Sequence, residues 1–197
     1  MEILKLNQGN YREVFQKAVA AVKKGEVLVC PTDTVYGLLC DAANKKAVKK
    51  LFKIKKRSKN KPIPIFVRDI KMAKKLAKIN SQQEKFLRKI WPGPVTVVLP
   101  IKGKKGTIGI RIPKHKWLLN LVKQLGCPLA ESSANISGKP ASTRIKEVLK
   151  QFTLRRGSGQ GNQKYQPDLV IDVGDLRESK SSKVIDLTIW PPKILRI

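Results

Sequence analysis

Two apolar patterns alternate along the chain, and this alternation limits the folds that it can adopt. Several segments carry apolar residues at helical spacing, and short β-rich runs lie between them. We expect helices over 11–22, 47–52, 70–76, 81–90, 118–125 and 145–152. We expect strands over 27–30, 63–67, 95–99, 107–112, 128–131, 169–173, 183–187 and 194–197. The pattern predicts an α/β protein with a twisted, mixed sheet and flanking helices. Because no linker separates two parts, we expect a single domain over residues 1–197.

Local signals at the helix ends agree with this reading. Asn44 and Asp69 are candidate N-caps, and Gly126 is a candidate C-terminal stop. The pattern Ser81-x-x-Glu84 is typical of a capping box. The glycine-rich segment 153–167 is expected to be a flexible loop.

The charge of the chain is strongly positive. Lys and Arg number 42 and Asp and Glu number 14, which gives a formal net charge of +28. Ten basic residues and no acidic one lie between Lys45 and Lys61. Such a field attracts the phosphates of a nucleotide or of a nucleic acid. A merely solvated basic surface remains the alternative, since 32 of the 42 basic residues are Lys.

Other features exclude whole classes of protein. No apolar run approaches the roughly 20 residues that span a bilayer, and the N-terminal residues lack the apolar region of a secretion signal. Three scattered cysteines (Cys30, Cys40 and Cys127) and a single histidine, His115, do not form the pattern of a zinc site. We therefore expect a cytoplasmic protein without a membrane segment or a metal site, with His115 in a turn or at the surface.

Four segments carry polar residues suited to binding a ligand: 31–37, 55–62, 107–113 and 132–140. Hydroxyls and a glycine after a strand can line a ligand crevice, and Lys and Arg can neutralise a triphosphate. Each segment also has a plainer alternative. The first can be an ordinary β-turn and the second a solvated basic turn. Arg111 in the third can point to a pocket or to water. The fourth can cradle a phosphate but lacks the Walker A spacing, and no G-x-S-x-G nucleophile motif occurs.

In their order along the chain, five motifs resemble the YrdC-like family of threonylcarbamoyl-AMP synthases, in its short, single-domain TsaC type. These motifs are PTDTVYGL, K-x-R followed by a Lys-Pro, WPGPVTVVL, IGIRIP and SSANISGKP. The resemblance runs from about residue 12 to the C-terminus. PTDTVYG and SSANISG, about 100 residues apart, are its most specific pair.

The resemblance implies an activity, a fold and a set of partners. The chain would be a nucleotidyltransferase that makes L-threonylcarbamoyl-AMP and pyrophosphate from L-threonine, bicarbonate or CO₂, and ATP. ATP would carry Mg²⁺ on its triphosphate. A downstream threonylcarbamoyl transferase would use the product to form threonylcarbamoyladenosine in tRNA. The expected fold is an α/β sheet with a concave, positively charged cavity.

The resemblance also assigns site residues and no metal ligand. The residues expected to bind ATP are Lys55, Arg57, Lys61, Thr107, Ser133, Asn135 and Arg196, of which Lys55 and Arg57 are also the expected catalytic residues. Those expected to bind threonine are Thr34, Arg111 and Ser182, with Arg111 on the carboxylate. Three positions depart from the family pattern: Ser58 where proline is frequent, Phe66 where histidine is common, and Ala141 where a hydroxyl is frequent.

Two other functions remain as alternatives. A non-catalytic RNA- or ribosome-binding protein could use the same basic cavity, although only 6% of the residues are aromatic and no RNP-like run occurs. A carbamoyl-transfer domain detached from a larger maturation enzyme is the third possibility, and the lack of zinc-finger segments counts against it. Weak tRNA binding through phosphate contacts is compatible with the main interpretation.

Overall fold

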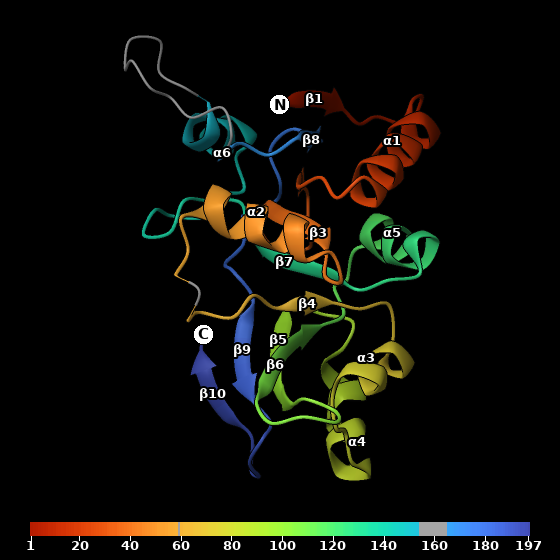
Figure 1. Ribbon diagram of the computed structural model, residues 1–197, viewed down its shortest axis with the longest axis vertical. Coiled ribbons are helices and arrows are strands. Elements are labelled where there is room, and N and C mark those ends of the chain that lie inside the picture. Colours follow the sequence, from red (N-terminus) through yellow and green to blue (C-terminus); the bar gives the residue numbers. More distant parts are fainter. Residues whose placement is uncertain (59, 154–164) are drawn as a thin grey trace.

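The computed structural model describes residues 1–58, 60–153 and 165–197. Ten strands in this part form one mixed sheet in the order β1-β8-β2-β3-β7-β4-β6-β5-β9-β10 (Figure 1). The strands are β1 (Glu2–Lys5), β2 (Leu28–Cys30), β3 (Gly37–Asp41), β4 (Ile65–Phe66), β5 (Val95–Pro100), β6 (Thr107–Arg111), β7 (Leu129–Ser133), β8 (Leu169–Asp172), β9 (Lys183–Asp186) and β10 (Lys193–Arg196). The helices are α1 (Tyr11–Lys23), α2 (Lys45–Lys55), α3 (Ile70–Leu76), α4 (Ser81–Ile90), α5 (Lys116–Leu125) and α6 (Ile145–Phe152). The expected α/β class with a mixed sheet is confirmed.

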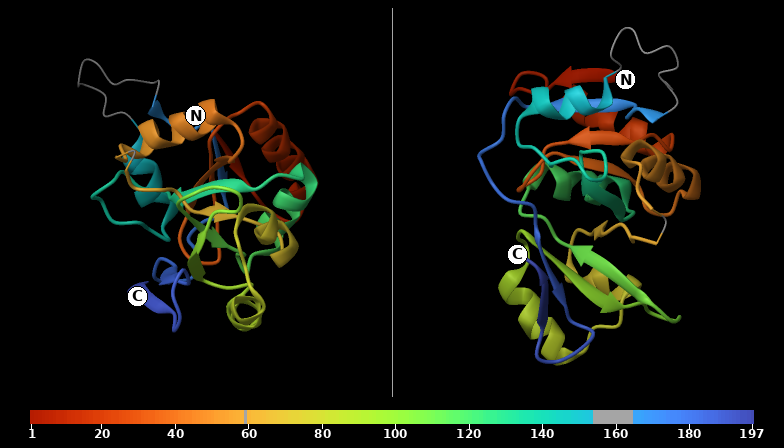
Figure 2. Two further views of the ribbon diagram at one scale, coloured as in Figure 1. Left: turned by 60° about the horizontal axis from the view of Figure 1, so that its bottom comes forward. Right: turned by 90° about the vertical axis from the view of Figure 1, so that its left-hand side faces the viewer.

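Helices cover both faces of the sheet around β2. Leu28 and Cys30 pack in one cluster with α1 and α5, whereas Val29 packs in a second cluster with α2 and α6. Successive side chains of a strand point to opposite faces, so the three-residue run is buried on both sides. Figures 1 and 2 show α1 and α5 side by side on one flank.

The sheet turns strongly between its two halves. In Figure 1, strands β3 and β7 run from side to side, whereas β9 and β10 run close to vertical. Figure 2 marks both termini in two further views. A third apolar cluster packs α3 and α4 against β5 and β6, through residues such as Ala73, Leu87, Val97 and Ile110. Because of this twist, residues of β7 and residues of β5, β6, β9 and β10 line the same cavity.

Two strands were not expected from the sequence. β1 is an edge strand that pairs in parallel with β8, and most of its side chains are exposed, so it carries no apolar run. β3 pairs antiparallel with both β2 and β7 and is almost wholly buried, so it lacks alternation. Alternation of apolar and polar residues marks a half-buried strand, and neither of these two strands is half-buried.

Most of the helix-end predictions are confirmed. The Asn44 side chain accepts hydrogen bonds from the first turn of α2, and Asp69 Oδ1 accepts from Met72 N at 2.7 Å. Gly126 ends α5 in the left-handed region, with φ 70°. His115 lies at the turn that begins α5 and is half-buried, with Nδ1 accepting from Leu118 N at 3.4 Å.

The capping box of α4 lies one residue earlier than predicted. Asn80 Oδ1 accepts from Gln83 N at 2.8 Å, and Gln83 Oε1 accepts from Asn80 N at 2.9 Å. Asn is as good an N-cap as Ser. Ser81 is therefore the first helical residue, and Glu84 instead pairs with Lys74 and Arg88. The predicted loop 153–167 falls largely on residues 154–164, outside the described residues.

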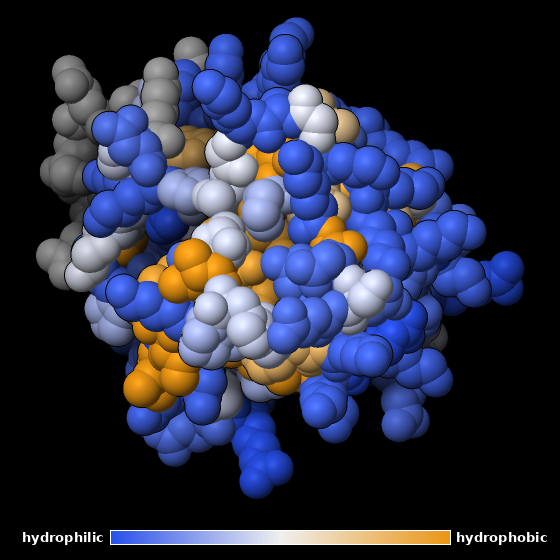
Figure 3. Space-filling model, turned by 90° about the horizontal axis from the view of Figure 1, so that it is seen from below, coloured by the Kyte–Doolittle hydropathy of each residue, from blue (hydrophilic) through white to orange (hydrophobic). Residues whose placement is uncertain are grey.

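The surface seen from below in Figure 3 is mostly hydrophilic, with hydrophobic residues gathered toward its lower left and smaller hydrophobic areas near its centre. The C-terminal segment carries several large exposed apolar side chains: Ile189, Trp190, Ile194, Leu195 and Ile197. Among the described residues, no helix has both the length and the apolar character needed to cross a membrane.

Candidate active site

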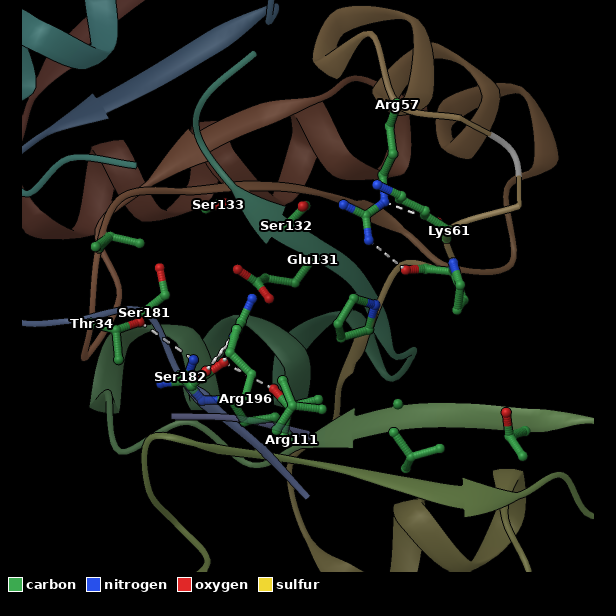
Figure 4. A pocket seen from close by; sticks show the side chains of 18 of the residues that line it. Thr34, Arg57, Lys61, Arg111, Glu131, Ser132, Ser133, Ser181, Ser182 and Arg196 are labelled. Atoms are coloured by element: carbon green, nitrogen blue, oxygen red, sulfur yellow. Dashed lines mark hydrogen bonds between the residues drawn. The ribbon is translucent and has the colours of Figure 1, made fainter. Parts of the chain in front are cut away.

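A cavity of about 370 Å³, which we call the central cavity, lies between the two halves of the sheet. Its volume falls within the roughly 300–1,000 Å³ typical of small-molecule sites. The lining residues come from the segment after β2, the segment after α2, strands β5, β6 and β7, and the chain around β9 and β10. Eight of the ten predicted ligand residues line it: Thr34, Arg57, Lys61, Thr107, Arg111, Ser133, Ser182 and Arg196 (Figure 4 labels all but Thr107).

Thr34 lies in the tight turn that follows β2. Thr32 Oγ1 accepts from Thr34 N at 3.0 Å and donates to Val35 O at 2.7 Å. The carbonyl of Thr34 accepts from Ser179 Oγ at 2.8 Å, which ties this turn to the segment leading into β9. The segment is thus a turn, as the plainer alternative proposed, and it still presents Thr34 to the cavity.

Arg111 ends β6 and is only 1% exposed. Its Nε donates to Gly93 O at 3.1 Å, and Nη2 donates to Asp33 Oδ1 at 2.5 Å. Nη1 lies 3.4 Å from Thr34 Oγ1. The alternative in which Arg111 faces water is wrong, because the guanidinium is buried at the wall of the cavity.

Two neighbours hold this guanidinium in place. Asp33 uses its second carboxylate oxygen to accept from Lys114 N at 2.8 Å, so it is fixed on both sides. The guanidinium carbon of Arg111 lies 5.4 Å from the centre of the Phe66 ring, within the range of a cation–π contact. At the position where the family often has histidine, Phe66 therefore packs on the arginine instead of donating a hydrogen bond.

Arg57 and Lys61 occupy the other side of the cavity (Figure 4). Arg57 donates from Nε to Lys61 O at 2.9 Å and from Nη2 to Pro62 O at 3.0 Å. Burial lowers the pKa of Arg57, and the charge of Arg196 lowers that pKa further. The guanidinium groups of Arg57 and Arg196 thus repel one another across a space that an anion would stabilise.

Lys55 and Asn135 do not line the cavity and lie behind Ser133. The Lys55 ammonium donates to Ser133 O at 2.6 Å and to Asn135 Oδ1 at 2.8 Å, and two further oxygens of the same residues lie within 3.3 Å. Burial lowers the pKa of Lys55 to about 8. Lys55 and Asn135 therefore lie next to the cavity, where their hydrogen bonds hold the segment after β7 in place.

Arg196 and Ser182 meet at the edge formed by β9 and β10. Arg196 Nη2 donates to Ser182 O at 2.6 Å, and Ser182 Oγ lies 3.1 Å from Thr96 Oγ1. The residues assigned to the nucleotide and to threonine are therefore in direct contact here. Thr107, at the start of β6, is exposed and also lines the cavity.

Sequence reasoning missed Glu131. It lies on β7, is 9% exposed, and lines the cavity together with Ser132 and Ser133. Burial raises the pKa of the Glu131 carboxyl, and the charges of Arg111 and Lys55 lower it in part. It is the one acidic side chain that lines the cavity among the described residues. An acid at the end of the expected strand 128–131, two positions before Ser133, was the available signal.

The fold and the central cavity define an α/β protein with a small-molecule site rich in arginine and hydroxyl groups. A family model named Sua5_yciO_yrdC, described as "Telomere recombination", matches residues 20–197. The chain belongs to this Sua5/YciO/YrdC family, which confirms the resemblance found in the motifs.

Relatives and solved structures agree with this assignment. The chain is 36% identical to the threonylcarbamoyl-AMP synthase of Pyrococcus abyssi over 188 residues, covering 91% of this chain and 52% of that protein. It is 34% identical to the putative threonylcarbamoyl-AMP synthase of Methanocaldococcus jannaschii over 194 residues, covering 95% of this chain and 86% of that protein. The crystal structure of P. abyssi Sua5 complexed with L-threonine matches with a TM-score of 0.86 and 33% identity, over 100% of this chain and 57% of that one. The chain thus spans about half the length of the Pyrococcus protein.

Proposed function

We propose that this chain is an L-threonylcarbamoyladenylate synthase. It would be a nucleotidyltransferase that joins L-threonine, bicarbonate or CO₂, and ATP into threonylcarbamoyl-AMP and pyrophosphate. The observation that carries the proposal is the composition of one cavity. It holds Arg111 with Thr34, suited to a small carboxylate, and it also holds Arg57 with Lys61, suited to a polyphosphate. The name of the Pyrococcus relative and the L-threonine in its crystal structure support the same reading.

Threonine would bind at the wall formed by β6 and the turn after β2. Arg111 is buried there with its guanidinium fixed by Asp33, so it meets a carboxylate without first having to be ordered. The hydroxyls of Thr34 and Ser182 line the same cavity and can accept or donate hydrogen bonds to the amino acid.

The reaction needs positioning and charge neutralisation more than a protein nucleophile. The amine of threonine takes up CO₂ to form a carbamate, and a carbamate oxygen attacks the α-phosphorus of ATP as pyrophosphate leaves. Arg57, Lys61 and Arg196 would neutralise the triphosphate. Because Arg196 donates directly to the carbonyl of Ser182, the carbamate and the α-phosphate would meet at this contact.

Of the remaining residues predicted to bind the nucleotide, two line the cavity and two lie behind the segment after β7. Thr107 and Ser133 would border the nucleotide. Lys55 and Asn135 would hold the segment after β7 in the shape that receives the phosphates, with the Lys55 charge directly behind it. Magnesium would enter with the triphosphate, as part of the substrate.

The product would pass to a downstream threonylcarbamoyl transferase that modifies tRNA, in the cytoplasm. Any tRNA binding by this chain itself would be weak. No observation favours the non-catalytic RNA- or ribosome-binding alternative, and a cavity of about 370 Å³ lined by hydroxyls and arginines suits a small ligand better than a strand of RNA.

The test is product formation by the purified chain. Pyrophosphate release and the mass of threonylcarbamoyl-AMP are measured with ATP, L-threonine and bicarbonate, and then with each omitted in turn. We expect release only with all three. Arg111→Ala should reduce product formation by weakening threonine binding, whereas Arg144→Ala, which removes a largely exposed arginine at the start of α6, should leave product formation unchanged. A chain that binds tRNA tightly at high salt and makes no pyrophosphate would instead be the RNA-binding protein.

A further inference from the structure

The carboxylate of Glu131 faces the central cavity without a partner among the residues that the structure describes. Within residues 1–58, 60–153 and 165–197, it makes no hydrogen bond within 3.5 Å and no salt bridge within 4.0 Å. Figure 4 shows it directed into the space between Arg196 and the serines of β7. A carboxylate with so little exposure is stabilised when a cation or a proton joins it. Its position therefore points to a ligand group that completes it.

The backbone opposite Glu131 leaves room for this carboxylate. Gly37 lies on β3, which pairs with β7, and a Cβ atom built on Gly37 would lie 3.2 Å from Glu131 Oε1. The same Cβ would lie 3.1 Å from Thr32 Cγ2. The glycine of the PTDTVYG motif thus permits Glu131 and the threonine turn to approach each other closely.

The charges around Glu131 narrow the class of ligand. Lys55, Arg111 and Arg196 surround it with positive charge, and Asp33 adds a negative one. None of these cations pairs with it directly, so the open side of the carboxylate faces ligand space. ATP has no cationic group of its own, and its Mg²⁺ would be held by the triphosphate on the side of Arg57 and Lys61. An α-amino acid carries a carboxylate for Arg111 and an ammonium for Glu131, and the two charges are separated by only one carbon atom.

We propose that Glu131 binds the ammonium group of the amino-acid substrate and accepts a proton from it, which frees the nitrogen to form the carbamate. This inference rests on the proposed function.

The proton transfer and carbamate formation balance as follows: ammonium, Glu131 carboxylate and bicarbonate give carbamate, Glu131 carboxylic acid and water. The N–C bond forms as a C–O bond of bicarbonate breaks. One ammonium proton goes to Glu131 and a second goes into the water that leaves, and Glu131 returns its proton to solvent after the product departs. The raised pKa of the carboxyl brings it closer to that of the amine it would deprotonate.

A rival role for Glu131 is simple compensation of the positive charge in the cavity. The two roles differ in what they predict for a ligand that lacks the amine. (R)-3-hydroxybutanoate has the carbon skeleton, the hydroxyl and the carboxylate of L-threonine without its ammonium. If Glu131 only offsets charge, Glu131→Gln should strengthen the binding of the hydroxybutanoate anion and should change little the binding of L-threonine, which carries no net charge. If Glu131 binds the ammonium, the binding of L-threonine should itself weaken in Glu131→Gln.

The experiment is calorimetric titration of the parent and of Glu131→Gln with both ligands. We expect the parent to prefer L-threonine by about 10- to 150-fold, the value of a charge-assisted contact, and the variant to lose most of that preference. Glu131→Asp keeps the negative charge but places the carboxylate one methylene group farther from the ligand. It should therefore show an intermediate preference for L-threonine over (R)-3-hydroxybutanoate. It also provides the test if the Gln variant does not fold. Glu13→Gln, an exposed acid on α1, is the matched control.

Each outcome separates this inference from the proposed function. An unchanged affinity of Glu131→Gln for L-threonine, with pyrophosphate release still requiring three substrates, overturns the Glu131 assignment alone. A weakened affinity for L-threonine in Glu131→Gln, when the parent chain releases no pyrophosphate, supports the assignment and overturns the proposed reaction. The proton transfer has its own readout. In the parent, kcat should rise with pH as Glu131 loses its proton, and this rise should be absent from Glu131→Gln. If kcat still rises with pH in Glu131→Gln, Glu131 is not the base that takes the proton.

Discussion

Lys55 and Asn135 are joined by two hydrogen bonds, from the lysine Nζ to Asn135 Oδ1 at 2.8 Å and to Asn135 O at 3.2 Å. Asn135 in turn donates from Nδ2 to Lys139 O at 2.6 Å and accepts at Oδ1 from Ser133 Oγ. The ammonium at the end of α2 thus organises the SSANISG segment from inside. A residue that the motifs assign to phosphate contact also has a structural role that the motifs do not reveal.

Lys55→Met should therefore destabilise the fold as well as impair ATP use. The change leaves the oxygens of Ser133 and Asn135 without their donor, at about 1–3 kcal/mol for each buried acceptor. Urea unfolding of the parent and the variant measures the loss. Lys46→Met, at an exposed position of the same helix, is the control and should change the free energy of unfolding by less than about 0.5 kcal/mol. Equal values for the two variants would contradict the structural role.

The pKa of Lys55 predicts a dependence of stability on pH. Burial lowers this pKa from 10.5 to about 8, so the unfolded chain holds the proton over a pH range in which the folded chain has lost it. Below about pH 8 the cost of burying the ammonium is fully present, and it is relieved as the pH rises toward 10.5. The stability of the parent relative to Lys55→Met should therefore increase between pH 7 and pH 10, as measured by urea unfolding. A relative stability that falls over this range would show that the hydrogen bonds of the ammonium outweigh its burial.

The sequence was sufficient to predict those parts of the fold whose signals are local. Asn44 and Asp69 were recognised as caps because a cap depends on residues only three positions away. The strand Gly37–Asp41 was missed because burial on both faces removes the alternation that marks a strand. Glu131 was missed for a different reason. Its position in the cavity depends on the pairing of β3 with β7, which joins segments about 90 residues apart.

The direction of Arg111 shows the same limit. Alternation along β6 placed it opposite Ile110 and left open whether that face met water or a pocket. The answer depends on Asp33 and on Gly93, which belong to other segments and meet Arg111 only in the folded chain. The site residues taken from the family motifs converge on one cavity, but the hydrogen bonds that hold them could not be read from those motifs.

Arg57 and Arg111 should affect different substrates. Arg57 is half-exposed beside Lys61, whereas Arg111 is buried against Asp33. Calorimetric titration should find that Arg57→Ala mainly weakens ATP binding and Arg111→Ala mainly weakens threonine binding, each by about 1.5–3 kcal/mol. Arg111→Ala should also lower stability, because the largely buried Asp33 carboxylate loses its guanidinium partner and keeps only the hydrogen bond from Lys114 N. A variant of Arg111 that binds threonine as well as the parent does would overturn the carboxylate assignment.

The lysines of α2 should determine any affinity for tRNA. Lys46 and Lys49 are exposed on this helix, and contacts to phosphate release counterions, so binding should weaken steeply with salt. Replacing both with Ala should reduce the slope of log affinity against log salt by about 1–2. The matched control replaces the exposed Lys71 and Lys75 of α3. Filter binding over a series of salt concentrations measures both. Sequence-selective binding that persists at high salt would contradict the prediction and favour the RNA-binding alternative.

Gly37→Ala should weaken threonine binding, although Gly37 itself does not line the cavity. The new methyl would press on Thr32 at 3.1 Å and on Glu131 at 3.2 Å, so one of them must shift by a few tenths of an ångström. Overpacking of this kind costs about 1–3 kcal/mol, and it would move either the threonine turn or the carboxylate. Gly9→Ala, which meets only an ordinary contact at 3.4 Å, is the control. The combination with Glu131→Gln distinguishes the two possible shifts. If Gly37→Ala acts by displacing the carboxylate, it should have little further effect on threonine affinity once Glu131 is already neutral. A full effect in the double variant would place the disturbance in the Thr32 turn instead.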